Sequence, residues 1–345
     1  MKILYVGTLD PVGTCRMRME ALVELGHTVT AIDTRHPSQT GLRRWCARLA
    51  NYLKRPLDLT GVNKAILART AEAEFDLLWV DKTVVIRTQT LKEFARRQPG
   101  SKSVSYSLDD MLNPNNTSCY YKKCISVYDY HVTTKSYNVD ELLGLGAHRV
   151  VHVNNAYHAP VHRPHDLSAK ERAEWGSGVG FIGTFERERA TYIESLADAG
   201  INVVVRGDDR WNVLDRHPRI AHANNTAHGS LYAKCISATS INLGFLRKVN
   251  RDLQTTRTVE IPACGGFMLA ERTHEQCSLF EEGVEAEYFG DPDELIQKCR
   301  YYLAHEAERT LIASRGRERC LRSGYSYHTQ LEKILNKVKA DTFNS

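Results

Sequence analysis

The stretch RTVEIPACGGFMLAER, residues 257–272, combines a helical pattern, a Gly-Gly pair and an apolar run. TTRTVEIPACG (255–265) predicts a helix that begins at a threonine, and GFMLAE (266–271) predicts a buried strand. A helix that ends at glycine and leads directly into a buried strand is typical of a parallel sheet with helical crossovers. A single carboxylate, Glu260, lies within this helix, which makes it a candidate functional residue.

The same alternation of strands and helices extends on both sides of this stretch. In the second half of the chain, strands are expected at 179–185, 201–208, 240–245, 266–271 and 285–290. Helices are expected between them, at 187–200, 228–239, 255–265 and 291–306. The last of these has Asp291 as N-cap, Pro292 at its first position and Glu294 at its third.

The first half of the chain shows a second, similar alternation. Its expected strands are 2–7, 27–33, 75–81, 102–110, 129–135 and 149–155, with helices at 15–26, 88–97 and 139–146. We therefore predict an α/β protein with two Rossmann-like, doubly wound domains that face each other across a cleft. The expected division is an N-terminal domain at 1–160, a polar linker at 161–178, a second domain at 179–320 and a helical segment at 321–345 that packs back on the first domain.

Composition narrows the class of protein. The 345 residues are 42% hydrophobic and 25% charged, as in ordinary globular proteins, and the net charge of +5 is too small to indicate nucleic acid by itself. There is no apolar run long enough to span a membrane, and because the N-terminus leads directly into a strand pattern we expect no signal peptide. We expect a cytoplasmic protein whose 9 cysteines are reduced.

The turn after the strand at 179–185 has the features of a phosphate site. Gly183 and Thr184 precede an expected helix N-terminus, where backbone N–H groups can face an anion, and Arg187 and Arg189 follow within one turn. An ordinary strand–turn–helix with exposed arginines explains the same four residues equally well.

The beginning of the 255–265 helix has the features of a sugar or nucleotide site. Thr255 and Thr256 are suitable N-cap residues, so the positive end of the helix would face a ligand. Asp252 and Glu260, eight positions apart, could accept hydrogen bonds from neighbouring sugar hydroxyls. A solvated loop aspartate and a salt-bridged helix glutamate remain the alternative.

Residues 179–335 resemble the C-terminal half of GT-B glycosyltransferases, specifically the spore-maturation (CgeB-like) branch related to retaining glycosyltransferase family 4. The resemblance rests on FIGTFERERATYIESLADAGINVVVRGDDRW, INLGFLRKVNRDLQTTRTVEIPACGGFMLAERT, LFEEGVEAEYFGDPDELIQKCRYYLAH and SGYSYHTQL. LLWVDK, YSLDDMLNP and VYDYHVTTKSYNVDELLGLGAHRV in the first half resemble the same branch more loosely.

The resemblance implies a GT-B fold and roles for particular residues. Glu260 matches the second acidic residue of the family's E-x7-E pair, which holds the ribose, and Asp252 matches the first, beside the donor sugar. Arg189 matches one of two basic residues that bind the diphosphate, whereas Thr184 stands where the other is expected. The further donor-binding candidates that it implies are Arg247, Lys248 and Arg257, and on the base side Gly207, Asp208 and Trp211.

The expected reaction is glycosyl transfer from a nucleotide-diphosphate sugar, such as a UDP-sugar, without a metal or another cofactor. Fixed arginines and helix N-termini would stabilise the leaving diphosphate. The only DxD, Asp291-Pro292-Asp293, is better explained as a helix cap. Asp109 and Asp110 end an expected strand and are candidates for a base or for orienting the acceptor hydroxyl, with capping of the next turn as the alternative. Polar residues at neighbouring strand ends are Lys135, His152, Asn154 and Asn155.

A basic segment at 35–70 is the main indication about the acceptor. It contains eight Lys and Arg residues (Arg35, Arg43, Arg44, Arg48, Lys54, Arg55, Lys64 and Arg69) and one acid, Asp58. Leu42, Trp45, Cys46, Leu49 and Leu53 fall at helical spacing within it. A peripheral membrane-surface helix, a polyanion contact and a core-packed helix with a solvated basic face all fit.

Other classes stay open at this stage. The acceptor can be an envelope glycan or lipid, a protein or a nucleic acid, as in a phage-type DNA-modifying glycosyltransferase, and the oligomeric state is open. A catalytically silent nucleotide-sugar-binding protein would share the donor site and would not hydrolyse the donor. A sugar-nucleotide epimerase would isomerise its substrate without an acceptor. A dehydrogenase is disfavoured because neither half contains GxGxxG.

Overall fold

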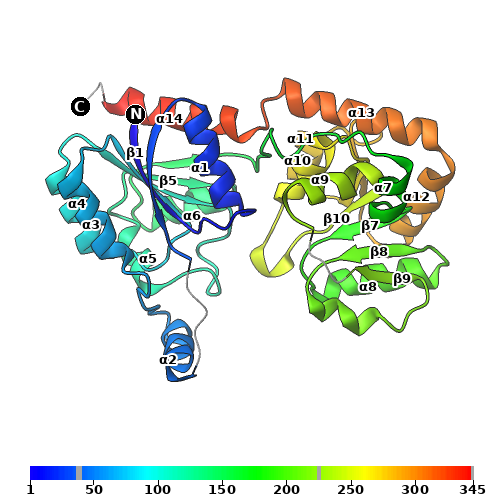
Figure 1. Ribbon diagram of the computed structural model, residues 1–345, viewed down its shortest axis with the longest axis horizontal. Coiled ribbons are helices and arrows are strands. Elements are labelled where there is room, and N and C mark those ends of the chain that lie inside the picture. The colour runs from blue at the N-terminus through cyan, green and yellow to red at the C-terminus, as the bar shows by residue number, and fades with distance from the viewer. Residues whose placement is uncertain (36–40, 224–226, 343–345) are drawn as a thin grey trace. The chain divides into compact units, whose positions relative to one another are not determined.

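The protein consists of two compact units in a computed structural model that describes residues 1–35, 41–223 and 227–342 (Figure 1). The first unit comprises Met1–Asn154 and Tyr327–Ser345, and the second comprises Asn155–Ser326. Each unit contains one six-stranded sheet in which all paired strands are parallel.

The sheet of the first unit has the strand order β2-β1-β3-β4-β5-β6. Its strands are β1 (Lys2–Gly7), β2 (Thr28–Asp33), β3 (Leu77–Asp81), β4 (Lys102–Ser107), β5 (Tyr130–Thr133) and β6 (Val150–His152). Its helices are α1 (Thr14–Glu24), α2 (Gly41–Tyr52), α3 (Val62–Glu72), α4 (Thr88–Arg97), α5 (Cys119–Cys124), α6 (Asn138–Gly144) and α14 (Tyr327–Thr342).

Alternate residues of the central strands bury opposite faces of this sheet. Leu4 and Val6 of β1 join Leu78 and Val80 of β3 in a core that also contains apolar residues of α3 and α4. Between them, Tyr5, Trp79 and Tyr106 form a stacked aromatic row, with ring centroids 6.5 and 5.4 Å apart. Two covered faces explain why these strands are apolar along their whole length.

The aromatic row lies beside a fully buried ion pair. Arg18 of α1 donates two hydrogen bonds to Asp81, at the end of β3, from Nε (2.7 Å) and Nη2 (2.8 Å). Its Nη1 donates to the Tyr327 hydroxyl of α14, and the Tyr5 hydroxyl donates to Asp81. Burial alone would lower the pKa of Arg18, but Asp81 outweighs it and the pKa is raised. These contacts fix α1, β3 and the distant α14 together.

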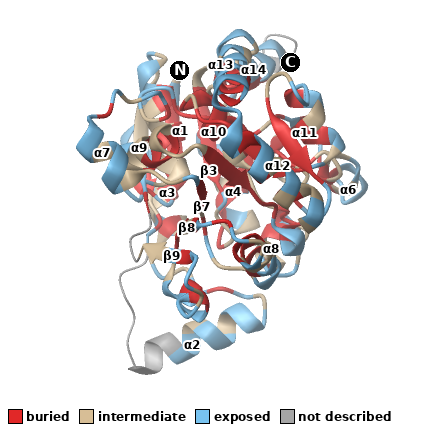
Figure 2. Cartoon of the chain, turned by 90° about the vertical axis from the view of Figure 1, so that its right-hand side faces the viewer, coloured by how far each residue is buried: buried red, intermediate tan, exposed pale blue. Residues whose placement is uncertain are grey.

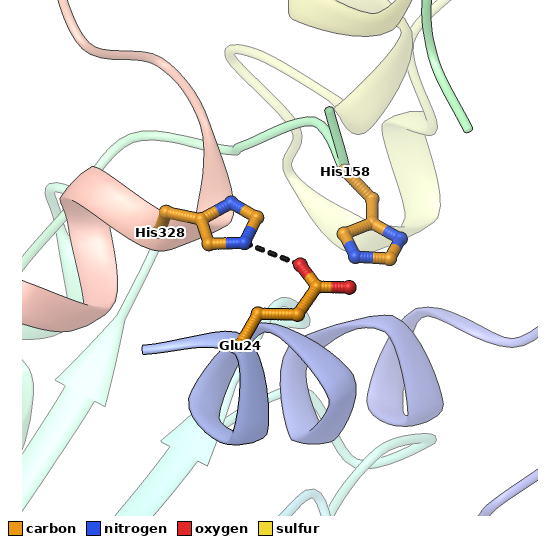
Figure 3. Close-up of side chains that lie close together, drawn as sticks. All are labelled: Glu24, His158 and His328. Atoms are coloured by element: carbon orange, nitrogen blue, oxygen red, sulfur yellow. Dashed lines mark hydrogen bonds and ion pairs between the residues drawn. The ribbon is translucent and has the colours of Figure 1, made fainter. Parts of the chain in front are cut away.

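The C-terminal helix α14 runs beside α1 in Figure 1, although about 300 residues separate them in sequence. His328 of α14 donates from Nε2 to the Glu24 carboxylate of α1 at 2.5 Å (Figure 3). The chain therefore returns at Tyr327 from the second unit to the first. The sequence predicts that the returning segment begins at residue 321. In the structure, residues up to Ser326 belong to the second unit.

The sheet of the second unit has the strand order β12-β11-β10-β7-β8-β9. Its strands are β7 (Val179–Ile182), β8 (Val203–Arg206), β9 (Ile220–Ala223), β10 (Ile241–Gly244), β11 (Met268–Glu271) and β12 (Glu287–Phe289). Its α-helices are α7 (Ala169–Trp175), α8 (Arg187–Asp198), α9 (Gly229–Ala238), α10 (Thr256–Ala263), α11 (His274–Leu279), α12 (Pro292–Ala304) and α13 (Glu306–Arg322), and two short 3₁₀ helices are η1 (Asp209–Leu214) and η2 (Lys248–Asn250).

Helices cover both faces of this second sheet as well. Leu269 of β11 packs into a core with apolar residues of α8 and α12, whereas its neighbours Met268 and Ala270 pack with residues of α9 and α10. Figure 2 shows buried strands surrounded by helices with exposed outer faces. Each sheet is thus doubly wound.

The expected elements correspond closely to the observed ones, with a few differences. Asp291 caps α12 by accepting a hydrogen bond from the Glu294 N–H, which confirms the cap interpretation of Asp291-Pro292-Asp293. Strand β9 was not expected, because its sequence IAHA lacks a clear apolar pattern. The stretch 161–178, expected as a linker, lies within the second unit and contains α7. Among the described residues, no helix is both long and apolar enough to cross a membrane.

Candidate functional site

The candidate donor residues gather at the point of the second sheet where the strand order reverses. The chain enters the sheet at β7, and β8 and β9 lie on one side of it and β10 to β12 on the other. Ligands of open α/β sheets bind beyond the carboxyl ends of the strands at such a switch point. Gly183 and Thr184 follow β7, and Arg247 and Lys248 follow β10, so both segments lie at this edge.

The turn after β7 is held by close backbone packing. The Trp211 indole N–H donates to the Gly183 carbonyl at 2.9 Å, and the Gly183 N–H donates to the Arg206 carbonyl. A Cβ added to Gly207 would lie 2.3 Å from the Gly183 oxygen, and one added to Gly183 would lie 2.7 Å from the Phe181 ring. Both glycines are therefore required by the packing of this turn.

Trp211 itself does not fit the base-side role expected from the sequence. Its side chain is fully buried in the core of the second unit and makes edge contacts with Phe181 and Phe185. A ring with no exposed face cannot stack on a nucleotide base. The structure therefore corrects this assignment: Trp211 supports the Gly183 turn from behind.

Asp208 is also occupied by local contacts. It accepts hydrogen bonds from the Phe185 N–H and from the Arg210 guanidinium. The hydrogen bonds from Arg210 lower the pKa of Asp208 below its usual value. The carboxylate thereby links the turn after β8 to the turn after β7.

Arg189 of α8 is the most unusual side chain of the site. It is 2% exposed, and its Nη1 donates to the Thr184 carbonyl at 3.1 Å. Its Nε and Nη2 are buried and have no hydrogen-bond partner among the described residues, and no carboxylate of those residues lies within ion-pair distance. Burial, and then the neighbouring Arg257, lower the pKa of Arg189 to about 10. A buried guanidinium without a counter-ion is costly, and an anion bound here would relieve that cost.

Arg257 reaches the same turn from the first turn of α10. Its Nε donates to the Ile182 carbonyl, the last residue of β7, at 2.6 Å. Arg189 and Arg257 both lie against the Phe181 ring, with guanidinium carbons 5.7 and 5.9 Å from its centroid. Two helices therefore bring two cations to the Gly183–Thr184 turn.

The other basic candidates are arranged differently. Arg187, the first residue of α8, is exposed. Arg247 pairs with Glu186 at 2.7 Å, and Lys248 pairs with Glu271 at 2.5 Å. These last two cations already have carboxylate partners, so a bound diphosphate would have to share or replace them.

The N-terminus of α10 has the expected cap. Thr255 is the N-cap and Thr256 the first helical residue, and the Thr255 N–H donates to the Thr258 hydroxyl at 3.0 Å. Asp252, which precedes the helix, is 8% exposed and accepts a hydrogen bond from the Asn250 side chain at 2.7 Å.

Glu260 lies in the middle of α10 and is 7% exposed. Its carboxylate is 3.7 Å from Nε2 of His162, a residue that sequence reasoning missed. The His158 N–H donates to Nδ1 of His162, so the proton of the neutral ring is on Nε2 and faces Glu260. Burial lowers the pKa of His162, although Glu260 opposes this shift. The lowered pKa favours the neutral form of the ring. Tyr232 is also buried beside Glu260, and burial followed by this carboxylate raises its pKa.

His162 escaped notice because its segment, HAPVHRPH (158–165), is rich in polar residues and prolines and resembles a linker. Three histidines within eight residues were the available signal. In the structure His162 is 4% exposed and packs edge-on to the Tyr232 ring.

The acceptor candidates of the first unit separate into two kinds. Asp109 pairs with Lys82, which follows β3. Asp110 is fully buried and accepts hydrogen bonds from the Leu112 and Asn113 N–H groups and from the Asn138 amide. Asp110 is therefore a turn cap, the alternative that the sequence had left open, and strand β4 ends at Ser107 before both residues.

The remaining strand-end residues differ in burial and in the unit to which they belong. Lys135 is buried and His152 is exposed. Asn155 belongs to the second unit, where its N–H and side-chain amide donate to Gln254.

Comparison with solved structures identifies the class of fold. Sucrose-phosphate synthase from Thermosynechococcus elongatus has a TM-score of 0.69 at 13% identity, over 99% of this chain and 100% of that one. Anabaena HepE in complex with UDP and glucose gives 0.64 at 14%, over 99% and 100%. An E. coli structure described as trehalose-6-phosphate bound with UDP-2-fluoro glucose gives 0.66 at 11%, over 98% and 99%. The predicted α/β fold is confirmed, and its two parallel sheets match those of GT-B glycosyltransferases.

Part of the sequence also matches a protein family model. Residues 187–336 match the family model described as Glycosyl transferase-like. The matched stretch includes Arg189, Arg257 and Glu260 of the candidate site. None of the curated proteins matches the sequence significantly.

Proposed function

We propose that this protein is a glycosyltransferase whose second unit binds a nucleotide-diphosphate sugar of the UDP class. The observation that carries the proposal is the buried Arg189 guanidinium, which has two nitrogens without partners among the described residues at the turn after β7. The family match over residues 187–336 and the UDP complexes among the structural neighbours support a nucleotide sugar as the anion. Placement in the CgeB-like branch, related to retaining family 4, is part of the proposal.

The donor would be held by three groups of side chains. Arg189 and Arg257, with the exposed Arg187 and the N–H groups at the start of α8, would bind the diphosphate. Glu260 would accept hydrogen bonds from the ribose hydroxyls, with His162 fixing its carboxylate. Asp252, before the N-terminus of α10, would face the donor sugar.

The chemistry requires stabilisation of a leaving nucleoside diphosphate. Positive charges that are already in place stabilise developing negative charge without reorganisation. Arg247 and Lys248 would contribute by exchanging Glu186 and Glu271 for phosphate oxygens. We therefore propose a metal-independent, retaining transfer in which the leaving phosphate takes the acceptor proton. Activity should survive EDTA, and complete loss that manganese or magnesium restores would contradict metal independence.

The first unit supplies the acceptor-side candidate. Asp109, held by Lys82, is the remaining candidate for orienting an acceptor hydroxyl, because Asp110 is used as a turn cap. An envelope glycan or lipid, a protein and a nucleic acid, as in a phage-type DNA-modifying enzyme, are the acceptor classes to test.

The direct test combines donor binding with turnover. UDP-glucose and other UDP-sugars are screened by thermal shift, and the best binder is then assayed for UDP release with and without pooled acceptors. A ligand at 100 times its Kd should stabilise the fold by about 2.7 kcal/mol. If no nucleotide sugar of a panel covering UDP, GDP, ADP, CMP and dTDP stabilises the protein, the proposed donor site is wrong.

A catalytically silent binding protein is a second candidate, favoured by the engagement of Asp110 in a turn and Asp109 with Lys82. Binding without any UDP release, even in the absence of acceptor over long incubation, would support it. Appearance of an isomerised UDP-sugar without acceptor would instead indicate an epimerase.

A further inference from the structure

Helix α2 (Gly41–Tyr52) and the residues after it expose an unusual concentration of apolar side chains. Of the sixteen large apolar side chains that are exposed among the described residues, six lie within residues 45–59. They are Trp45 (61% exposed), Leu49 (42%), Tyr52 (80%), Leu53 (58%), Leu57 (42%) and Leu59 (38%). We call Trp45, Leu49, Tyr52 and Leu53 the α2 apolar face.

The spacing of these residues makes the helical part of the face continuous. Trp45, Leu49 and Tyr52 recur at intervals of four and three, and Leu53 continues the same stripe. In a helix packed on a core, this is the side that would be buried. The core-packed interpretation of the basic segment is therefore wrong for Trp45 to Leu53. The side chains of Leu42, Arg43 and Arg44 lie outside the described residues.

The end of α2 is fixed to its unit, whereas the helix itself stands apart from the sheet in Figure 1. Lys54 ends the helix in a left-handed conformation (φ 56°), and its carbonyl accepts a hydrogen bond from the Cys119 N–H at 2.8 Å. Pro56 is buried just after it. The first unit thus holds the base of α2 and leaves the apolar face uncovered by its own described residues.

Positive charge surrounds this face. Arg48, on the helix, and Arg55, just after it, are exposed, and neither forms an ion pair with a described residue. Asp58, the one acid of the segment 35–70, is occupied at the start of α3, where it accepts hydrogen bonds from the Val62 and Asn63 N–H groups. The surface is therefore both apolar and cationic.

We infer that the α2 apolar face binds an anionic lipid surface. Tryptophan and tyrosine favour the boundary between headgroups and acyl chains, leucines insert beside them, and flanking arginines contact anionic headgroups. A second copy of the chain fits less well. Twelve helical residues span about 18 Å, and one face of such a helix covers much less than the roughly 800 Å² per partner of a stable interface. This inference does not depend on the proposed transferase activity.

Vesicle flotation tests the inference without any enzymatic readout. The full chain is mixed with vesicles of pure phosphatidylcholine or of phosphatidylcholine with about one third phosphatidylglycerol. We expect flotation with the anionic vesicles, weaker at high salt. Leu49→Gln/Leu53→Gln should reduce partitioning at least about tenfold, because two inserting side chains become polar. The matched control is Leu143→Gln/Leu145→Gln, which changes two leucines of the same unit with similar exposure (46% and 53%) and should alter partitioning less than about twofold.

Trp45 provides an independent optical signal. Trp79 and Trp211 are fully buried and Trp175 is partly buried, so Trp45 is the exposed tryptophan. Anionic vesicles should shift the emission to shorter wavelength in the parent chain and not in Trp45→Phe, which should still float.

Several outcomes would overturn the inference. One is absence of flotation at low salt, and another is equal flotation of the Leu49→Gln/Leu53→Gln variant. Lipid-free dimerisation that this variant abolishes would show that a second copy covers the face. Tight binding of duplex DNA that competes with vesicles and survives both leucine changes would show a polyanion contact instead.

Discussion

Arg18 and Arg189 are the most deeply buried arginines of their units, and the two differ in where the balancing charge comes from. Arg18 in the first unit is 1% exposed and has Asp81 as a bidentate partner. Arg189 in the second unit is 2% exposed, donates to a backbone carbonyl and has no carboxylate partner among the described residues. Their pKa values accordingly move in opposite directions, raised for Arg18 and lowered to about 10 for Arg189. The first arginine is a structural element, and the second indicates a site for an anion.

The two arginines lie in equivalent helices, α1 after β1 and α8 after β7, each next to the point where the strand order of its sheet reverses. The first unit reverses direction between β1 and β3, and Asp81 at the end of β3 lies there beside α1. The second unit reverses between β7 and β10, and β10, the counterpart of β3, ends in Gly244 and not in an acid. Two similar α/β units therefore use the same edge for different purposes.

The largest effect is expected when the counter-ion of Arg18 is removed. Asp81→Asn should destabilise the first unit by about 3–5 kcal/mol, because Arg18 would remain buried without a charged partner. Urea unfolding measures the loss. Replacing both residues, as Arg18→Met/Asp81→Leu, should cost less than the single change. A cost below about 1 kcal/mol for Asp81→Asn would show that the ion pair is not what distinguishes this arginine.

Lowering the pH should destabilise the first unit more than the second, because their buried histidines have different surroundings. Burial lowers the pKa of His131 in β5 to about 4, although its Nε2–H donates to the Ile125 carbonyl. The unfolded chain takes up this proton near pH 6.5 and the folded chain only near pH 4. The contribution of His131 to the free energy of unfolding is therefore complete above pH 6.5. It is lost as the pH drops to 4, which lowers the stability by about 3 kcal/mol.

His162 in the second unit has Glu260 beside it, which opposes its pKa shift. Hydrogen exchange between pH 7 and 4.5 should show earlier loss of protection in peptides of β5 than in those of β7. His131→Gln should reduce the pH dependence of the first unit. Equal acid sensitivity of parent and variant would remove His131 as the cause.

Removal of the second arginine should affect the ligand rather than the fold. Arg189→Met should weaken UDP binding about 100-fold, since a buried charged donor to the diphosphate is lost. Stability without ligand should be unchanged or higher, because an uncompensated charge is removed. Calorimetry with UDP gives the first value and urea unfolding the second. Arg309→Met is the matched control: this arginine is also buried in the second unit and donates to the Tyr302 carbonyl, so its loss should lower stability and spare UDP affinity.

The smallest effect concerns the ribose contact. Glu260→Ala should weaken UDP binding about tenfold, equivalent to about 1.4 kcal/mol, through loss of charge-assisted hydrogen bonds. Glu287→Ala serves as the control, because Glu287 is equally buried in the second unit but pairs with Lys298 and Tyr302. Unchanged UDP affinity in Glu260→Ala would place Glu260 with Asp81, as a structural carboxylate beside His162.

The fold was predictable because its signals are local. Apolar runs that end in glycine, helical stripes and a capped helix at Asp291 each depend on a few neighbouring residues, and they located eleven of the twelve strands. The exception, β9, is a four-residue strand at the sheet edge whose sequence, IAHA, has no clear apolar pattern. The candidate site was predictable only as residue types at strand ends, through the resemblance of 179–335 to GT-B glycosyltransferases.

What the sequence by itself determined is the order of the elements, the doubly wound class and a set of polar residues at one edge of each sheet. Only the tertiary structure decided what each polar group does, because burial and partners come from distant segments. In the tertiary structure Trp211 and Asp110 are buried and support turns, and His162 lies beside Glu260. Arg18 has a counter-ion 63 residues away in the sequence, whereas Arg189 has none among the described residues. In the sequence both residues are simply arginines. The energy of each charge depends on which groups the fold brings within a few ångströms of it.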